Sequence, residues 1–244
     1  MSRRRLLLLA GTAEARELAN RLAKAGFEVI ASLAGSTRQP RPMAVTTRIG
    51  GFGGQEAQAA YMTDQAFDLV IDATHPFADR ISQRSAEICA ALSIPYLRYS
   101  RPAWTPNPGE TWNFVKSAMQ LPDLICEKSR VFLATGGQSE DIAKALPGRV
   151  LFCRRVDDGP EPFLLSGGWI TGRPPFTLAA ETALLEQLGV GWLVAKNAGG
   201  AARAKLDAAR ALGVKVAMIA RPDGPDAETV STLGEVMAWA EAHQ

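Results

Sequence analysis

Short apolar runs alternate with amphipathic stretches along the first hundred residues. The expected strands are 6–10, 27–33, 44–49, 67–71 and 94–97, and the expected helices are 14–24, 55–63 and 78–92. Apolar runs of strand length with amphipathic helices between them are typical of βα units, whose strands pair in parallel beneath helices on both faces. The pattern therefore predicts a doubly wound α/β domain.

A break in this rhythm follows Tyr99. Pro102, Pro106, Pro108 and Gly109 crowd a short polar stretch that can hold neither a helix nor a central strand. Beyond it the rhythm resumes. Further strands are expected at 130–134, 150–153, 169–171, 192–195 and 214–219, and helices are expected up to 146 and at 178–188, 201–212 and 230–242.

The chain is therefore expected to be an α/β protein of two Rossmann-like domains with parallel sheets. Residues 1–100 would form an N-terminal α/β domain, and residues 101–244 a C-terminal α/β domain. Ligands of such sheets bind beyond the carboxyl ends of the strands, so an interdomain cleft is expected. The pattern leaves open the strand order and whether the last helix packs on the first domain.

Composition narrows the possible partners. The net charge is +2, from 27 Lys and Arg against 25 Asp and Glu, without basic clusters, so no nucleic-acid partner is expected. Cys89, Cys126 and Cys153 are odd in number and far apart, which predicts neither disulfides nor a metal site and fits a cytoplasmic protein. The apolar run 6–10 is too short for an export signal, and no run approaches the roughly 18 apolar residues of a membrane span.

The turn after the first strand is a candidate phosphate site. Gly11 and Thr12 lead into the first helix, whose unpaired N–H groups and dipole attract anions. Because only one glycine is present, the alternative is a tight turn in which Thr12 caps the helix.

The end of the second strand bears on which dinucleotide would bind. NAD-binding folds place an acid there for the ribose 2′-OH, whereas here no Asp or Glu occurs between Glu28 and Glu56. Ser32 and Arg38 stand in this interval instead, which indicates NADP unless they are ordinary solvated loop residues. After the third strand, Gly50-Gly-Phe-Gly-Gly54 either brings backbone and a ring close to a ligand or forms a flexible turn.

His75, one of two histidines, follows the fourth strand in Asp72-Ala-Thr-His-Pro-Phe-Ala78. Pro76 biases it away from helical geometry, and a histidine there can donate a proton or bind an acidic ligand. It could equally be a satisfied loop residue. No serine or carboxylate stands at a triad spacing, so the sequence gives no support for hydrolysis.

Basic residues follow the expected strands of the second domain. They are Arg154, Arg155, Arg173, Lys196 and Arg221. Their repeated placement predicts a site for several carboxylates or phosphates, although each one alone is an ordinary surface residue. Glycine turns at 134–138 and 196–200 would add backbone donors.

Six motifs follow one another over nearly the whole chain. They are Gly11-Thr-x-Glu-Ala-Arg-x-Leu-Ala19, Gly50-Gly-Phe-Gly-Gly54, Asp72-Ala-Thr-His-Pro-Phe-Ala78, Arg101-Pro-x-Trp104, Thr135-Gly-Gly137, and Lys196-Asn-x-Gly-Gly200 with Arg221-Pro222. In this order and spacing they resemble the precorrin-6A reductase family of cobalamin biosynthesis, which includes cobalt-precorrin-6A reductases. The sequence departs from the family at Ala10, where a glycine is usual.

The resemblance implies an oxidoreductase that uses NADPH to transfer hydride to the macrocycle of precorrin-6A, giving precorrin-6B. Its substrate is a polycarboxylate tetrapyrrole, its further partners would be other enzymes of the corrin pathway, and no metal is implied. The nicotinamide supplies the chemistry while the protein orients the two reactants. The residues agree with this, since a polycarboxylate needs basic strand ends and the second strand lacks the acid of an NAD site.

The site residues are assigned on the same basis. The cofactor residues would be Gly11, Thr12, Ala13, Glu14, Ser32, Arg38, Gly51, Phe52 and Gly53. The substrate residues would be Thr74, His75, Arg101, Gly136, Gly137, Arg154, Arg173, Lys196, Asn197, Gly199, Gly200 and Arg221. His75 and Lys196 would be catalytic.

Three alternatives remain at this point. The substrate could be cobalt-precorrin-6A of the anaerobic route, because both macrocycles carry similar acid arms. Two α/β domains with a basic cleft could also form a cofactor-free cyclase of the uroporphyrinogen-III synthase type or a bilobed anion receptor. Binding of a nicotinamide cofactor separates the reductases from both of the other classes.

Overall fold

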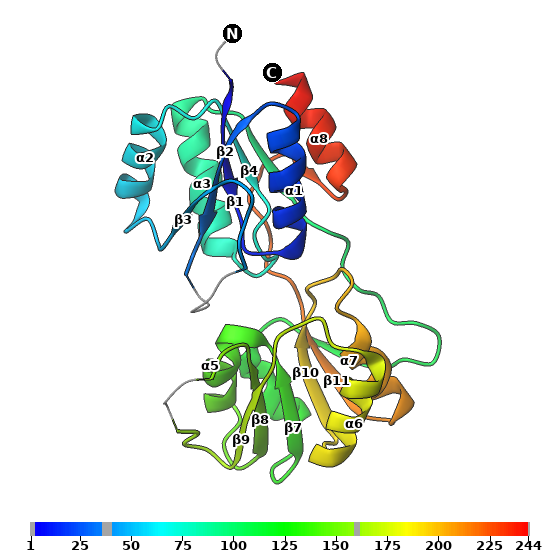
Figure 1. Ribbon diagram of the computed structural model, residues 1–244. Coiled ribbons are helices and arrows are strands. Elements are labelled where there is room, and N and C mark those ends of the chain that lie inside the picture. The colour runs from blue at the N-terminus through cyan, green and yellow to red at the C-terminus, as the bar shows by residue number, and fades with distance from the viewer. Residues whose placement is uncertain (1–2, 36–40, 159–161, 244) are drawn as a thin grey trace. The chain divides into compact units, whose positions relative to one another are not determined.

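The structure, a computed structural model, describes residues 3–35, 41–158 and 162–243 (Figure 1). The chain divides into two units: Met1–Pro102 with Pro222–Gln244, and Ala103–Arg221. Each unit contains one six-stranded parallel sheet, so the expected α/β class with two Rossmann-like sheets is confirmed. The expected division differs in two respects. Residues 101 and 102 belong to the first unit, and residues 222–244, expected in the second domain, contribute a strand and a helix that pack on the first unit.

The sheet of the first unit has the order β12-β5-β4-β1-β2-β3. Its strands are β1 (Arg5–Leu9), β2 (Glu28–Leu33), β3 (Thr46–Ile49), β4 (Leu69–Asp72), β5 (Tyr96–Tyr99) and β12 (Thr229–Val230). Its helices are α1 (Ala13–Lys24), α2 (Gln55–Asp64), α3 (Asp79–Leu92) and α8 (Leu233–Ala242). This is the Rossmann order, with the chain reversing direction across the sheet between β1 and β4.

The alternation of side chains along β1 explains its unbroken leucine run. Leu6 and Leu8 pack with the buried faces of α1 and α8, whereas Leu7 and Leu9 pack with residues of α2 and α3. Figure 1 shows the two helix pairs on opposite faces of the sheet. Because successive side chains of a strand point to opposite faces, a strand covered on both sides must be apolar throughout.

The second unit repeats this architecture with the order β6-β11-β10-β7-β8-β9. Its strands are β6 (Trp112–Val115), β7 (Arg130–Ala134), β8 (Val150–Arg155), β9 (Gly167–Thr171), β10 (Trp192–Lys196) and β11 (Lys215–Ile219). Its helical segments are η1 (Ala118–Gln120), α4 (Leu121–Leu124), η2 (Gly136–Gln138), α5 (Ser139–Lys144), α6 (Leu178–Leu188) and α7 (Ala204–Ala211). One face of its core is formed by residues of α6 and α7 against the strands.

One edge strand of each sheet, β12 in the first and β6 in the second, pairs with a strand far away in the sequence. β6 follows β5 in sequence but pairs with β11, and β12 follows β11 but pairs with β5. Each is followed by the same local feature: Gln120 accepts a hydrogen bond from the Lys116 N–H at 2.6 Å, and Glu235 accepts one from Ser231 at 3.1 Å. The two halves of the sequence therefore exchange equivalent strands.

The sequence pattern missed both exchanged strands. β12 has two residues and β6 has four, of which Phe114 is 55% exposed. A two-residue strand such as β12 is too short to show a periodicity, and β6 has no continuous apolar run because Asn113 interrupts it. The last helix begins at Leu233 rather than at 230, because Thr232 and Glu235 form a capping box that fixes its start.

Candidate functional site

The β1–α1 turn lies where the chain reverses direction across the first sheet. Gly11 has φ +131°, a conformation that favours glycine, and a Cβ there would have open space around it. The Thr12 side chain caps α1 by accepting from the Ala15 N–H at 3.1 Å, and its hydroxyl donates to the Ala73 carbonyl at 2.9 Å. Ala13 and Glu14 form the first turn of α1. The turn therefore has the Thr12 helix cap that was the alternative to a phosphate site, and a hydrogen bond joins it to Ala73, directly after β4.

The loop after β4 is held by a buried carboxylate. Asp72, 1% exposed, accepts from the Thr74 N–H at 2.9 Å, from the Thr74 hydroxyl at 2.6 Å and from the Tyr96 hydroxyl at 2.9 Å. Burial, together with the neighbouring Asp72 charge, raises the pKa of Tyr96, so this phenol stays a donor. The network fixes the two residues that lead into His75.

The ring of His75 has a defined donor side. Its Nδ1 accepts a hydrogen bond from the Phe77 N–H at 3.2 Å, and the Phe77 ring lies 5.8 Å away. An imidazole that accepts at Nδ1 carries its proton on Nε2 when neutral. The half-buried His75 is therefore a donor through Nε2 at the carboxyl end of β4.

The ends of β2 and β3 bring together Ser32 and an arginine that the sequence reasoning overlooked. Arg48 donates to the Ser32 hydroxyl at 2.8 Å and to the carbonyls of Gly50 and Gly51 at 3.0 and 3.1 Å. Its guanidinium lies 3.9 Å from the centre of the Phe52 ring. Gly53, with φ +88°, completes the turn. Arg38, the predicted 2′-phosphate ligand, lies outside the described residues.

Arg101 and Glu14 contact each other. The Arg101 Nη1 donates to the Glu14 carboxylate at 2.8 Å, and the two side chains are 13% and 24% exposed. The sequence assigned Glu14 to the cofactor and Arg101 to the substrate. Their pairing leaves the acid at the start of α1 neutralised, so it repels an anion at this turn less.

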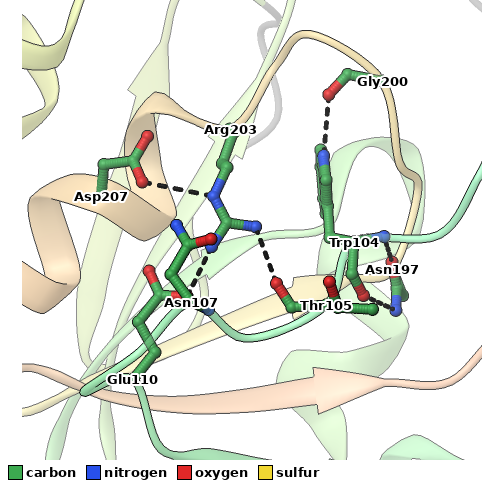
Figure 2. Close-up of polar contacts among 8 residues, drawn as sticks. All are labelled: Trp104, Thr105, Asn107, Glu110, Asn197, Gly200, Arg203 and Asp207. Atoms are coloured by element: carbon green, nitrogen blue, oxygen red, sulfur yellow. Dashed lines mark hydrogen bonds and ion pairs between the residues drawn. The ribbon is translucent and has the colours of Figure 1, made fainter.

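In the second unit, Asn197 holds the segment that enters from residue 103. Its side chain, 6% exposed, accepts from the Trp104 N–H at 2.8 Å and donates to the Trp104 carbonyl at 3.0 Å (Figure 2). The Trp104 indole donates to the Gly200 carbonyl at 2.7 Å, and Arg221 Nε donates to the Asn197 carbonyl at 2.7 Å. These contacts explain why an Asn and a glycine turn follow β10, and they give both a structural part.

Arg203 also binds the segment that begins at residue 103, as Figure 2 shows. It donates to the Thr105 carbonyl at 3.1 Å and to Asp207 at 3.3 Å, pairs with Glu110 at 2.5 Å, and lies over the Trp112 ring. The Glu110 side chain is only 2% exposed. The segment 103–110 is therefore fixed to the start of α7, and short-range sequence patterns gave no sign of it.

Arg154 is enclosed by its own unit. It forms a two-point contact with Glu181 at 2.6 and 3.1 Å, with side chains 12% and 3% exposed, and its guanidinium lies between the Phe132 and Phe176 rings. These contacts would give Arg154 a structural role in addition to or instead of the predicted substrate contact. Arg173 pairs with Asp157 in the same unit.

The remaining predicted residues lie at loops of the second sheet. Gly136 and Gly137 begin η2, beside a 2.8 Å contact between the Thr135 and Ser139 hydroxyls. The helix that follows, α5, has only six residues. Lys196 is the last residue of β10, and Gly199 follows it with φ +67°. The two predicted catalytic residues lie at the carboxyl ends of strands that hold equivalent positions in the two sheets: His75 is in the loop after β4, and Lys196 is the last residue of β10.

Metal and thiol chemistry are not indicated by the described part of the chain. Within residues 3–35, 41–158 and 162–243, no three His, Cys, Asp or Glu side chains are grouped as a metal site. None of the helices described is long and apolar enough to cross a membrane. Burial raises the pKa of the Cys89 and Cys153 thiols to about 12.

We expect the three thiols to react unequally. Near neutral pH the exposed Cys126 should react quickly with a disulfide reagent such as DTNB, and the buried Cys89 and Cys153 should react slowly because their thiolate is disfavoured. The release of coloured thiolate by native and denatured protein measures this. Three equally fast groups in the native protein would contradict the burial.

Replacing Asp72 with alanine should loosen the His75 loop. The change leaves the Tyr96 hydroxyl and Thr74 without their buried acceptor, which should lower the free energy of unfolding by about 1–3 kcal/mol. Denaturant titration measures the loss, and Asp64→Ala, at an exposed site at the end of α2, is the control. Equal stability of the two variants would remove the proposed support of the loop.

The chain is similar to known proteins over nearly its whole length. The family model described as Precorrin-6x reductase CbiJ/CobK matches residues 5–241. The precorrin-6A reductase of Rhodobacter capsulatus is 42% identical over 243 residues, covering 98% of this chain and 96% of the relative. That of Rhodococcus erythropolis is 41% identical over 242 residues, covering 96% of each. The cobalt-precorrin-6A reductase of Priestia megaterium is 28% identical over 253 residues, covering 95% of this chain and 96% of the relative.

A solved structure described as CobK precorrin-6A reductase has the same fold. It superposes with a TM-score of 0.92 at 40% identity, covering 98% of this chain and 97% of that chain. The likeness therefore extends through both units. The chain belongs to the precorrin-6x reductase CbiJ/CobK family.

Proposed function

We propose that the protein reduces precorrin-6A to precorrin-6B with NADPH, in the biosynthesis of cobalamin. Family membership makes it a precorrin-6A reductase, an oxidoreductase whose substrate is a tetrapyrrole. The observation that carries the proposal in this chain is the hydrogen bond from Thr12 to Ala73. It joins the candidate phosphate turn to the His75 loop at the point where Rossmann sheets bind dinucleotides.

The residues of the first unit fit a dinucleotide. Gly11 leaves open space at the N-terminus of the 12-residue helix α1, where backbone N–H groups can bind a pyrophosphate. Ser32 lies near the end of β2, and Phe52 lies just after the end of the neighbouring strand β3. Neither strand end carries the acid that an NAD site would place after β2. When bound, the nicotinamide supplies the hydride, and the protein has to orient the partners and exclude water.

His75 provides the donor on the substrate side. Because its Nδ1 accepts from Phe77, its Nε2 can hydrogen-bond an acid arm or deliver the proton that accompanies hydride transfer. In the second unit, Lys196, Arg173 and Arg221 are basic residues whose positive charge suits the carboxylates of a tetrapyrrole. Arg154, which pairs with Glu181, would support the structure of the second unit and not contact the substrate.

The metal-free substrate is preferred over its cobalt-bearing analogue. The precorrin-6A reductases named above are 41–42% identical to this chain, against 28% for the cobalt-precorrin-6A reductase of Priestia megaterium. Family membership and the Rossmann turn also count against a cofactor-free cyclase or an anion receptor. A cytoplasmic location remains an expectation from the three unpaired cysteines.

Turnover tests the proposal. The purified protein should consume NADPH with precorrin-6A and give a product two hydrogen atoms heavier, and it should be slower with cobalt-precorrin-6A or with NADH. The loss of NADPH fluorescence measures consumption of the cofactor, and mass spectrometry identifies the reduced macrocycle. Faster reduction of the cobalt macrocycle would assign the chain to the anaerobic route, and no reduction of either would refute the proposal.

A further inference from the structure

We propose that Arg48, together with Ser32, holds the 2′-phosphate of NADPH and so selects NADPH over NADH. This inference rests on the proposed function, because it names the residue that gives the reductase its coenzyme preference. It concerns one arginine of β3 that no sequence motif of the chain singles out.

The place of Arg48 in the sheet is the first argument. Ser32 and Arg48 are directly paired in the register of β2 and β3, and Ser32 is paired with Leu9 at the end of β1. The Ala10 N–H donates to the Ser32 carbonyl at 2.9 Å, which joins this pair to the phosphate turn. The end of the second strand is where Rossmann proteins read the 2′ position of the ribose, with an acid for NAD or a nearby arginine for NADP.

The guanidinium is already held in place. Its three hydrogen bonds go to the Ser32 hydroxyl and to the carbonyls of Gly50 and Gly51. Its central carbon lies over the Phe52 ring, 3.9 Å from the ring centre, and 5.2 Å from the centre of the Tyr61 ring. The ring of Phe52 is in turn supported by Tyr61, 5.5 Å away. A side chain ordered in this way loses little further freedom when an anion binds, which favours affinity.

The hydrogen-bonding capacity left at the pair suits a phosphate. A guanidinium has five N–H donors, and the three bonds to Ser32, Gly50 and Gly51 leave N–H groups for phosphate oxygens. Ser32 is buried, and its hydroxyl accepts from Arg48 and therefore keeps its own proton to donate. With no acid between Glu28 and Glu56, the charged side chains of residues 29–55 are all arginines and carry positive charge. A ribose 2′-OH could not make use of that charge, whereas a 2′-phosphate can.

Cofactor binding, followed by the fluorescence of NADPH and NADH in the absence of substrate, tests the assignment. The wild-type protein should bind NADPH much more tightly than NADH. Arg48→Met should weaken NADPH binding by about 10- to 100-fold and leave NADH binding unchanged, because only the 2′-phosphate loses its partner. Arg48→Lys keeps the charge but not the planar guanidinium, so its affinity for NADPH should lie between those of the wild type and Arg48→Met.

Arg21→Met is the matched control, since it removes the same charge from the exposed end of α1 in the same unit. It should bind both cofactors as the wild type does. If Arg48→Met does not fold, as judged by its melting curve, the lysine variant decides by the same comparison.

The outcomes separate the two proposals. A wild-type preference for NADPH that survives in both Arg48 variants would overturn the role of Arg48 and leave the proposed function standing. A wild-type protein that binds NADH as well as NADPH would overturn the NADPH dependence itself, and the role of Arg48 with it. Equal loss of NADPH and NADH affinity in Arg48→Met would also overturn the assignment, because it would show a general part in shaping the site.

Discussion

His75→Ala should lower kcat with precorrin-6A by about 10²- to 10⁴-fold, the range typical of a lost proton donor. The effect is expected because Nε2 is the donor side of a ring whose Nδ1 is occupied by the Phe77 N–H. NADPH binding should stay as in the wild type, since the proposed cofactor residues lie on the β1–α1 turn and at the ends of β2 and β3. Steady-state turnover and NADPH fluorescence titration give the two readouts.

His243→Ala is the matched control, because it removes the only other histidine, which contacts the Trp239 carbonyl near the end of the chain. It should turn over normally. Wild-type turnover by His75→Ala would return His75 to the ordinary loop residue that the sequence also allowed. A matching loss of NADPH affinity would mean that the loop supports the cofactor instead of the substrate.

The second large effect is on stability. Arg154→Met should lower the free energy of unfolding by about 3–5 kcal/mol, because it leaves the Glu181 carboxylate buried without its partner. The double variant Arg154→Met/Glu181→Leu should recover most of the loss, since a buried ion pair and an apolar pair of similar size are often equally stable. Denaturant unfolding of the two variants, with the exposed Arg210→Met as control, measures this.

The double variant also decides between two roles for Arg154. If the residue is structural, the stable double variant should keep the KM of the wild type for precorrin-6A. A raised KM in a well-folded double variant would favour the sequence-based assignment of Arg154 to the substrate. Equal stability of Arg154→Met and the wild type would mean that the pair does not hold this part of the unit.

The sequence predicted what depends on local pattern. Leu6 to Leu9 are apolar because both faces of β1 are covered, and this alone indicates a parallel sheet under helices. Thr12 and Gly11 could be recognised because a cap and a glycine turn are short-range features. The Asp72 to Ala78 motif marked the end of β4 for the same reason.

The rest depends on pairing between distant segments. The exchange of β6 and β12 brings together strands separated by more than a hundred residues, and nothing in two or four residues states which sheet they join. Arg48 lies beside Ser32 because of the β2–β3 register. Without that register the sequence could not distinguish Arg48 from Arg38 as a ligand of the 2′-phosphate. The structural contacts of Arg154 and Asn197 could not be predicted, because their partners, Glu181 and Trp104, are 27 and 93 residues away.

Hydride transfer from the cofactor is the central claim, and isotope transfer tests it most directly. Precorrin-6A incubated with the protein and NADPH that carries deuterium at both C4 positions should give a product one mass unit heavier than the product formed with ordinary NADPH, because one deuterium is delivered by the nicotinamide. A reduced product without deuterium would contradict the account. It would show that the hydrogen reaches the macrocycle from another source.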